Sequence, residues 1–163
     1  MRKNIAVFGG SLFQDIKLDK GKFLPTKKQS TIVLSKAYNI DNFSLEGMTS
    51  VRALQILKAL PIQQLYDDCI LALGEAELSD ETSFRHNLME IIEYLQENQV
   101  RPLLVSLPNE LLSDVKALRI QETIDNIAVE KNIDYIYEGN TDKTVSYIVL
   151  EEEDMNKAIL SLC

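Results

Sequence analysis

The stretch Ile5-Ala6-Val7-Phe8-Gly9-Gly10-Ser11-Leu12 decides the fold, because a short apolar run ends there in two glycines and a serine. Such a run predicts a buried strand followed by a tight turn. A serine exposed on that turn is a candidate nucleophile, and a serine nucleophile normally needs an imidazole to take its proton. The sequence has one histidine, His86, in what reads as the first turns of a long amphipathic helix. Ser11 is therefore a candidate nucleophile without an evident base.

Five segments read as short buried strands, and helical patterns separate them. The strands are predicted at 4–8, 40–44, 68–73, 102–107 and 133–137. The clearest helix is predicted over 80–98, with further helices around 51–57 and 120–127 and another that begins in the acidic run 151–154. Strands that alternate with helices predict a parallel sheet covered on both faces. We expect an α/β fold, a three-layer α/β/α sandwich with a five-stranded parallel sheet and flavodoxin-like topology.

Composition limits the classes of partner. The 163 residues carry a net charge of −8, which argues against binding to a phosphate backbone. Five lysines between positions 17 and 28 surround Gly21 and Pro25, and we interpret this segment as a solvated loop rather than a nucleic-acid patch. We expect one domain over 1–163, with no nucleic acid as partner.

The remaining compositional signals concern location and metals. No apolar stretch approaches the roughly 20 residues of a membrane span, so no membrane association is expected. Cys69 and Cys163 form neither a metal-ligand spacing nor a disulfide framework. The sequence is typical of a cytoplasmic protein that needs no cofactor.

Three segments that follow predicted strands resemble the motif blocks of the SGNH hydrolases, also called GDSL esterases and lipases. Gly9-Gly10-Ser11-Leu12 resembles the first block, Gly-Asp-Ser-Leu, with glycine in place of the aspartate. The segment 42–49 is similar to the second block, Asn-x-Gly-x-x-Gly-x-Thr, and Gly74-Glu75-Ala76-Glu77 falls where the third, Gly-x-Asn-Asp, is expected. Their order and intervals agree from Asn4 to about Leu107.

The resemblance implies a role for several residues. Ser11 matches the nucleophile, and its backbone N–H matches one donor of the oxyanion hole. Gly47 matches the second donor, also through its backbone N–H, although it equally suits a left-handed turn before Thr49 caps a helix. Ala76 stands where the third donor, an asparagine, is expected. Asp142 matches the aspartate of the last block, Asp-x-x-His, but Val145 stands in place of its histidine.

These departures predict weak catalysis. Loss of one oxyanion donor typically costs about 10²–10³ in turnover, and loss of the histidine of a serine triad costs about 10⁶. The backbone donors and substrate binding that remain can supply about 10³–10⁴ over water. The sequence predicts a degenerate SGNH-like protein, with weak or no ester hydrolysis, that binds a small-molecule ester or a carbohydrate-like ligand or acts in regulation.

Two other hypotheses stay open. An active esterase could use Ser11 with an unconventional base such as Asp142, Glu75 or Glu77, and those carboxylates could also hold a metal, although no ligand spacing favours one. We interpret Glu75 and Glu77 first as solvated loop acids, whose charge would disfavour an oxyanion nearby. A flavodoxin-like nucleotide-binding protein is the other alternative, although the phosphate-binding glycine motifs are missing.

Overall fold

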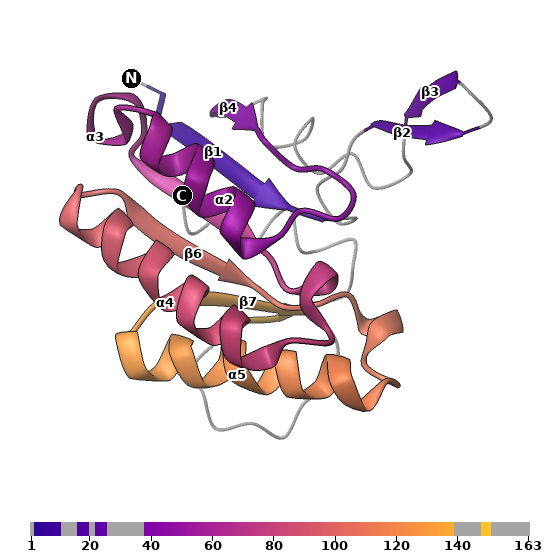
Figure 1. Cartoon of the computed structure of the whole chain (residues 1–163). Helices are drawn as coiled ribbons and strands as arrows, with labels where there is room; N and C mark the ends of the chain where they lie inside the picture. The colour runs from indigo at the N-terminus through magenta and orange to yellow at the C-terminus, as the bar shows by residue number, and fades with distance from the viewer. Residues whose placement is uncertain (1, 11–15, 20–21, 26–37, 139–147, 151–163) are drawn as a thin grey trace.

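A parallel sheet forms the centre of the structure (Figure 1). The protein is described by a computed structural model over residues 2–10, 16–19, 22–25, 38–138 and 148–150. The sheet has the order β4-β1-β5-β6-β7-β8, and every neighbouring pair is parallel. Its strands are β1 (Asn4–Gly9), β4 (Asn39–Asn42), β5 (Asp68–Ala72), β6 (Arg101–Val105), β7 (Asp134–Glu138) and β8 (Ile148–Leu150).

The five predicted strands and the α/β class are confirmed. The observed bounds differ from the predicted ones by no more than two residues. The chain passes from β1 to one neighbour, β4, and then returns to the other side of β1 for β5, β6 and β7. This is the doubly wound order of flavodoxin-like folds, in which ligands bind beyond the carboxyl ends of the strands where the order reverses. The edge strand β8 was not predicted.

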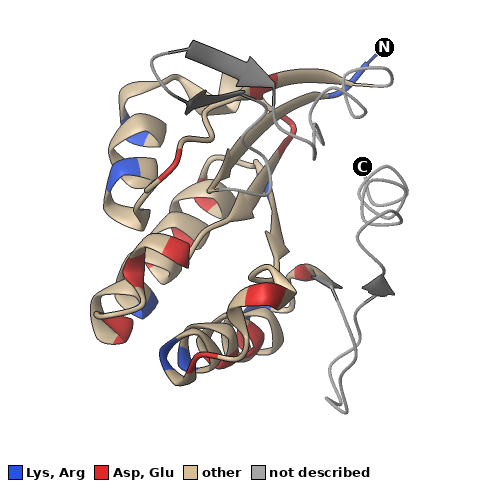
Figure 2. Ribbon diagram, turned by 90° about the vertical axis from the view of Figure 1, so that its right-hand side faces the viewer, with Lys and Arg blue, Asp and Glu red and all other residues tan. Residues whose placement is uncertain are grey.

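Three long helices cover one face of the sheet (Figures 1 and 2). They are α2 (Ser50–Ala59), α4 (Glu81–Glu97) and α5 (Val115–Lys131), and the shorter α3 (Ile62–Leu65) follows α2. Each long helix begins at a capping side chain: Thr49 accepts from Arg52 N, Asp80 from Ser83 N and Asp114 from Lys116 N. In α4 the buried residues recur at helical spacing, and they are Phe84, Leu88, Ile91, Ile92 and Leu95.

Alternate residues of the strands enter two separate apolar clusters. Ala6 and Phe8 of β1 pack with the helices, whereas Ile5 and Val7 belong to the second cluster on the opposite face. All four are fully buried, which explains why β1 reads as a continuous apolar run. The predicted helix that starts at 151–154 lies outside the described residues, so the second helical layer stays a prediction.

The lysine-rich segment differs from the expected solvated loop. Its described residues form an antiparallel hairpin of β2 (Ile16–Asp19) and β3 (Lys22–Pro25), in which Lys17 pairs with Leu24. Polar and apolar residues alternate in Ile16-Lys17-Leu18-Asp19, which is the period of a strand.

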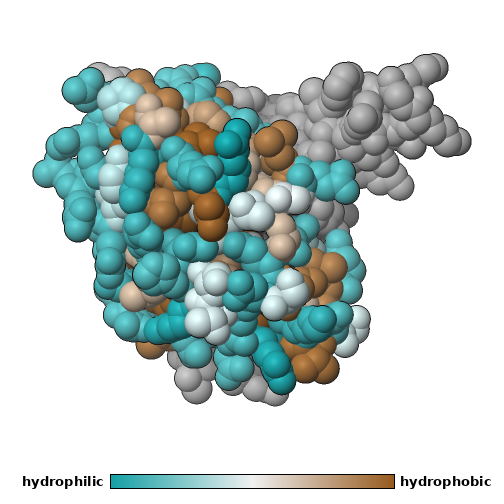
Figure 3. Space-filling view, in the orientation of Figure 1, coloured by the Kyte–Doolittle hydropathy of each residue, from teal (hydrophilic) through white to brown (hydrophobic). Residues whose placement is uncertain are grey.

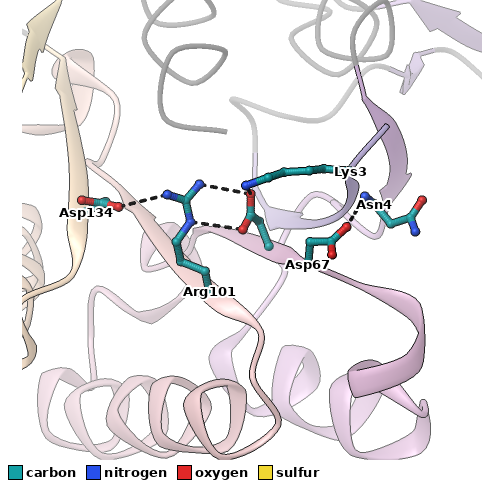
Figure 4. A network of polar contacts seen from close by, with 6 residues as sticks. Lys3, Asn4, Asp67, Arg101 and Asp134 are labelled. Atoms are coloured by element: carbon teal, nitrogen blue, oxygen red, sulfur yellow. Dashed lines mark hydrogen bonds and ion pairs between the residues drawn. The ribbon is translucent and has the colours of Figure 1, made fainter. Parts of the chain in front are cut away.

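The amino ends of four strands meet at a buried carboxylate (Figure 4). Asp68 at the start of β5 is 2% exposed, and the guanidinium of Arg101 on β6 binds both of its oxygens at 3.1 Å. Lys3, just before β1, lies 3.3 Å from the same carboxylate, and Arg101 also reaches Asp134 of β7 at 3.5 Å. We call these four residues the Asp68 network. It anchors β1, β5, β6 and β7 at the edge of the sheet opposite their carboxyl ends.

Candidate functional site at the carboxyl edge of the sheet

Segments that follow β1, β4 and β5 lie side by side at the carboxyl edge of the sheet. The amide of Phe43 donates to Val7 O at 2.8 Å, and that of Leu45 donates to Gly9 O at 3.1 Å. On the other side of β1, the amide of Gly10 reaches Ala72 O at 3.4 Å. The structure therefore brings together the three segments that the sequence analysis matched to motif blocks.

Two of the predicted catalytic residues lie outside the described part of the chain. Ser11 follows Gly10 directly, and Gly10 is the last described residue after β1. Asp142 falls between β7 and β8, as does Val145. The roles of Ser11 and Asp142 therefore stay predictions.

Gly47 has the left-handed backbone that its turn requires. Its φ is 75°, and a Cβ placed there would meet no atom within 4 Å. Thr49, two residues later, caps α2 by accepting a hydrogen bond from Arg52 N at 3.1 Å. The turn interpretation of Gly47 is thus confirmed, whereas its role as an oxyanion donor stays a prediction.

Gly74 turns the chain sharply after β5. Its φ is 121°, and a Cβ there would lie 2.7 Å from Cγ2 of Ile120 and 3.3 Å from Cδ2 of Leu107. Only a residue without a side chain fits both the conformation and the close approach. The turn leads into the 3₁₀ helix η1 (Glu75–Glu77), which holds Ala76 exposed at the edge of the sheet.

Ala76 and its two acidic neighbours face different surroundings. The methyl group of Ala76 has no hydrogen to donate to an oxyanion. The carboxylate of Glu75 lies against Gly10: a Cβ on Gly10 would lie 3.0 Å from Glu75 Oε2 and 3.1 Å from Glu75 Cδ. The carboxylate of Glu77 points to the start of α2 instead, where its Oε1 accepts from Ser50 N at 3.1 Å and from the Ser50 hydroxyl.

Glu77 is a partly buried carboxylate rather than a solvated loop acid. Burial raises the pKa of its carboxyl group, while the hydrogen bonds from Ser50 oppose that shift. Its Oε2 is buried without a hydrogen-bond partner among the described residues. The contact between Glu77 and Ser50 was not predicted from the sequence, in which its only signal is a hydroxyl residue next to the cap Thr49.

A cavity of about 720 Å³ opens between the starts of α2 and α4. We call it the edge groove. Most of the residues that line it are of polar type, and the full set is Thr49, Val51, Ala76, Glu77, Ser79, Asp80, Thr82, Ser83, His86 and Asn87. The face that carries these helices is largely hydrophilic, with an apolar group of side chains over α2 (Figure 3). The volume lies in the range of small-molecule sites.

His86 lines the edge groove from the second turn of α4. Its side chain is 79% exposed, and its Nε2 lies 3.8 Å from Glu90 Oε2. The predicted place of His86 in the first turns of a long helix is confirmed. His86 and Ala76 open onto the same cavity, although no residue spacing in the sequence predicts this.

The described residues contain no group of three or more histidine, cysteine or acidic side chains placed to hold a metal ion. Within the same part of the chain, none of the helices combines the length and the apolar character needed to span a membrane.

Comparison with known proteins identifies the fold. No family model matches the chain, and a search of curated proteins found no match. Among solved structures, AlinE4, an SGNH-hydrolase family esterase, is 26% identical with a TM-score of 0.61, over 83% of this chain and 75% of that protein.

Two further structures share the fold at lower identity. The psychrotrophic esterase EstA from Pseudoalteromonas sp. is 15% identical with a TM-score of 0.67, over 98% of this chain and 95% of that one. A putative lipolytic protein of the G-D-S-L family from Desulfitobacterium hafniense is 16% identical with a TM-score of 0.68, over 83% and 77%. Together with the doubly wound sheet, these neighbours show that this protein has an SGNH-hydrolase-like fold.

Proposed function

We propose that this protein binds a small-molecule ester or carbohydrate-like ligand at the carboxyl edge of the sheet and hydrolyses esters weakly or not at all. The observation that carries the proposal is Ala76, which is exposed on η1 and lines the edge groove where an oxyanion donor is expected. The sequence also has no histidine where the resemblance expects the catalytic base, because its one histidine, His86, lies on α4. This absence further supports the proposal.

The remaining machinery supports binding better than turnover. Gly47 and the N–H of Ser11 can still stabilise an oxyanion, and the edge groove supplies hydroxyl and amide groups for a polar ligand. Without a base, the Ser11 hydroxyl is a weak nucleophile at neutral pH. We therefore expect any hydrolysis to stay within about 10³–10⁴ of the uncatalysed rate.

Hydrolysis of p-nitrophenyl acetate, together with labelling by a fluorophosphonate, tests the catalytic half of the proposal. Wild type and Ser11→Ala should differ little in ester turnover, and fluorophosphonate labelling of wild type should be slow. Ester turnover at the rate of an ordinary esterase that Ser11→Ala abolishes would contradict the proposal and favour an active esterase with an unconventional base.

Thermal shift with triacetin and with acetylated xylobiose tests the binding half, because a ligand that binds only the folded state raises Tm. One of the two should raise the Tm of wild type. The matched control is Ala76→Trp, which fills the groove from an exposed position and should remove the shift while leaving the Tm of the free protein within a few degrees. A shift that survives in Ala76→Trp would place binding elsewhere.

A further inference from the structure

The edge groove lies between two helix starts, and a carboxylate of the chain occupies each of them. At α2, Glu77 Oε1 accepts from Ser50 N at 3.1 Å and from the Ser50 hydroxyl. At α4, the N-cap Asp80 accepts from Ser83 N at 3.1 Å. A helix N-terminus attracts anions through its free N–H groups and its dipole. Because Glu77 and Asp80 already meet that attraction, the groove offers little to an anionic ligand.

The charges around the groove sum to a negative value. Each of the two helix N-termini contributes about +0.5 unit charge and each ionised carboxylate contributes one negative charge, which leaves about −1 in total. Among the described residues that line the groove, none is a lysine or an arginine, and the only imidazole is that of His86. The imidazole lies 3.8 Å from Glu90 Oε2, so a positive charge on His86 would have its own counter-charge. The groove therefore attracts a cation and repels an anion.

The carboxylate of Glu77 is less well compensated than that of Asp80. Its Oε1 accepts both bonds from Ser50, while its Oε2 is buried and has no hydrogen-bond partner among the described residues. Burial raises the pKa of the Glu77 carboxyl group, even though the bonds from Ser50 oppose that shift. The bonds from Ser83 instead hold the pKa of Asp80 below its usual range. A positive charge in the groove would therefore stabilise Glu77 more than Asp80.

We propose that Glu77 makes the edge groove selective for ligands that carry a protonated amine beside hydroxyl groups, such as an amino sugar. This inference rests on the proposed function, because it takes the edge groove as the ligand site. An ammonium group compensates the Glu77 carboxylate by its charge and supplies three hydrogen-bond donors. Side chains with hydroxyl or amide groups line the same groove for the ring hydroxyls of the ligand, among them Thr49, Ser79, Thr82 and Asn87.

Three methyl glucopyranosides test the proposal because they differ only at carbon 6, which bears an ammonium, a hydroxyl or a carboxylate group. At about pH 7.5 the amine is protonated and the carboxyl group is ionised. Titrations of wild type followed by NMR should give Kd values that rise by about 10-fold or more from the amino glycoside to the glucoside, and rise again to the glucuronide. Equal affinity for the amino glycoside and the glucoside, tighter binding of the glucuronide, or no binding of the amino glycoside would each overturn the proposal.

The variant Glu77→Gln assigns the preference to one residue, because it removes the charge and keeps an oxygen that accepts from Ser50. It should lose the preference for the amino glycoside by about 10-fold or more, with little change in its affinity for the glucoside. Glu122→Gln is the matched control, since Glu122 is an exposed acid of α5 outside the groove lining and the net charge changes equally. An unchanged preference in Glu77→Gln, or an equal loss in the control, would contradict the role of Glu77.

Glu77→Asp provides a second variant, which keeps the charge on a shorter side chain. It should retain most of the preference, and a loss as complete as in Glu77→Gln would mean that shape rather than charge selects the ligand. The proposed function is judged by other measurements, which are ester turnover and the Tm shift with triacetin or acetylated xylobiose. Glycosides that bind equally, or that do not bind, therefore overturn this inference without deciding the proposed function.

Discussion

Gly74 and Gly47 both have a positive φ, but their surroundings differ. At Gly74 the backbone turn is closed in by Ile120 and Leu107, while Gly47 faces open space. Substitution of each glycine by alanine therefore distinguishes two contributions to the free energy of unfolding: an unfavourable backbone conformation at both positions, and steric overlap at Gly74 alone.

We expect Gly74→Ala to lower the free energy of unfolding by about 2–4 kcal/mol, because the strained φ and the overlap with Ile120 both contribute. Gly47→Ala should cost only about 1–2 kcal/mol, from the backbone alone. Urea denaturation of both variants checks this difference. Equal losses would mean that the packing around Gly74 adapts to a methyl group.

At the scale of elements, Glu77 joins η1 to the start of α2. The carboxylate of Glu77 accepts hydrogen bonds from the backbone N–H and the hydroxyl of Ser50, which is fully buried. This one carboxylate therefore connects η1, in the third motif segment, to α2. Because burial raises the pKa of Glu77, the folded protein binds this proton more tightly than the unfolded chain does.

This shift predicts a pH dependence of stability. The contribution of Glu77 favours folding below the ordinary pKa of a glutamate and is lost as pH rises through its higher pKa in the folded protein. The stability of wild type relative to Glu77→Gln, whose amide oxygen can still accept from Ser50, should therefore fall as the pH rises above the ordinary pKa of a glutamate. Urea denaturation at several pH values measures the difference, and a difference that does not change with pH would show that the carboxyl is not destabilised by burial.

Across the whole molecule, the two edges of the sheet have different roles. The carboxyl edge carries the glycine turns and the edge groove, and the amino edge carries the Asp68 network. Removal of one partner from a buried ion pair leaves a charge without compensation, which is costly.

We expect Arg101→Ala to lower the free energy of unfolding by about 3 kcal/mol, because Asp68 then keeps only Lys3 among the charged partners of the Asp68 network. In an Asp68→Asn background the same change should cost less than half as much. Ligand binding at the opposite edge should not change at 25 °C. If the two costs are equal, Arg101 stabilises the sheet through its packing rather than its charge.

Much of the fold was predictable from the sequence because buried strands and amphipathic helices leave strong periodic patterns. The strands β1 and β5 are buried at nearly every position, and α4 repeats its apolar residues at helical spacing. The hairpin of β2 and β3 was missed because polar and apolar residues alternate over only the four residues of β2, and Lys22-Phe23-Leu24-Pro25 of β3 does not alternate. The strand order is common to flavodoxin-like proteins and SGNH hydrolases, so the solved neighbours were needed to distinguish them.

The candidate site was predictable as a set of segments but not as a set of contacts. Parallel strands end at the same edge, so Gly10, Gly47 and Gly74 were expected to lie near one another. Glu75 and Glu77 are the same residue type two positions apart, so the sequence does not distinguish their contacts. In the structure, which turns at Gly74 before them, Glu75 lies against Gly10 and Glu77 binds Ser50. Contacts of this kind depend on backbone angles that residue patterns do not encode.

The exposure of Ala76 has a consequence for engineering. Gly74 keeps the backbone turn before Ala76, and a change at position 76 does not alter that glycine. The methyl group of Ala76 faces the edge groove rather than the core. A longer side chain can therefore be introduced at position 76 without repacking of the core. The scaffold is a starting point on which the parts of a hydrolytic site could be installed one at a time, with an asparagine at position 76 as the first.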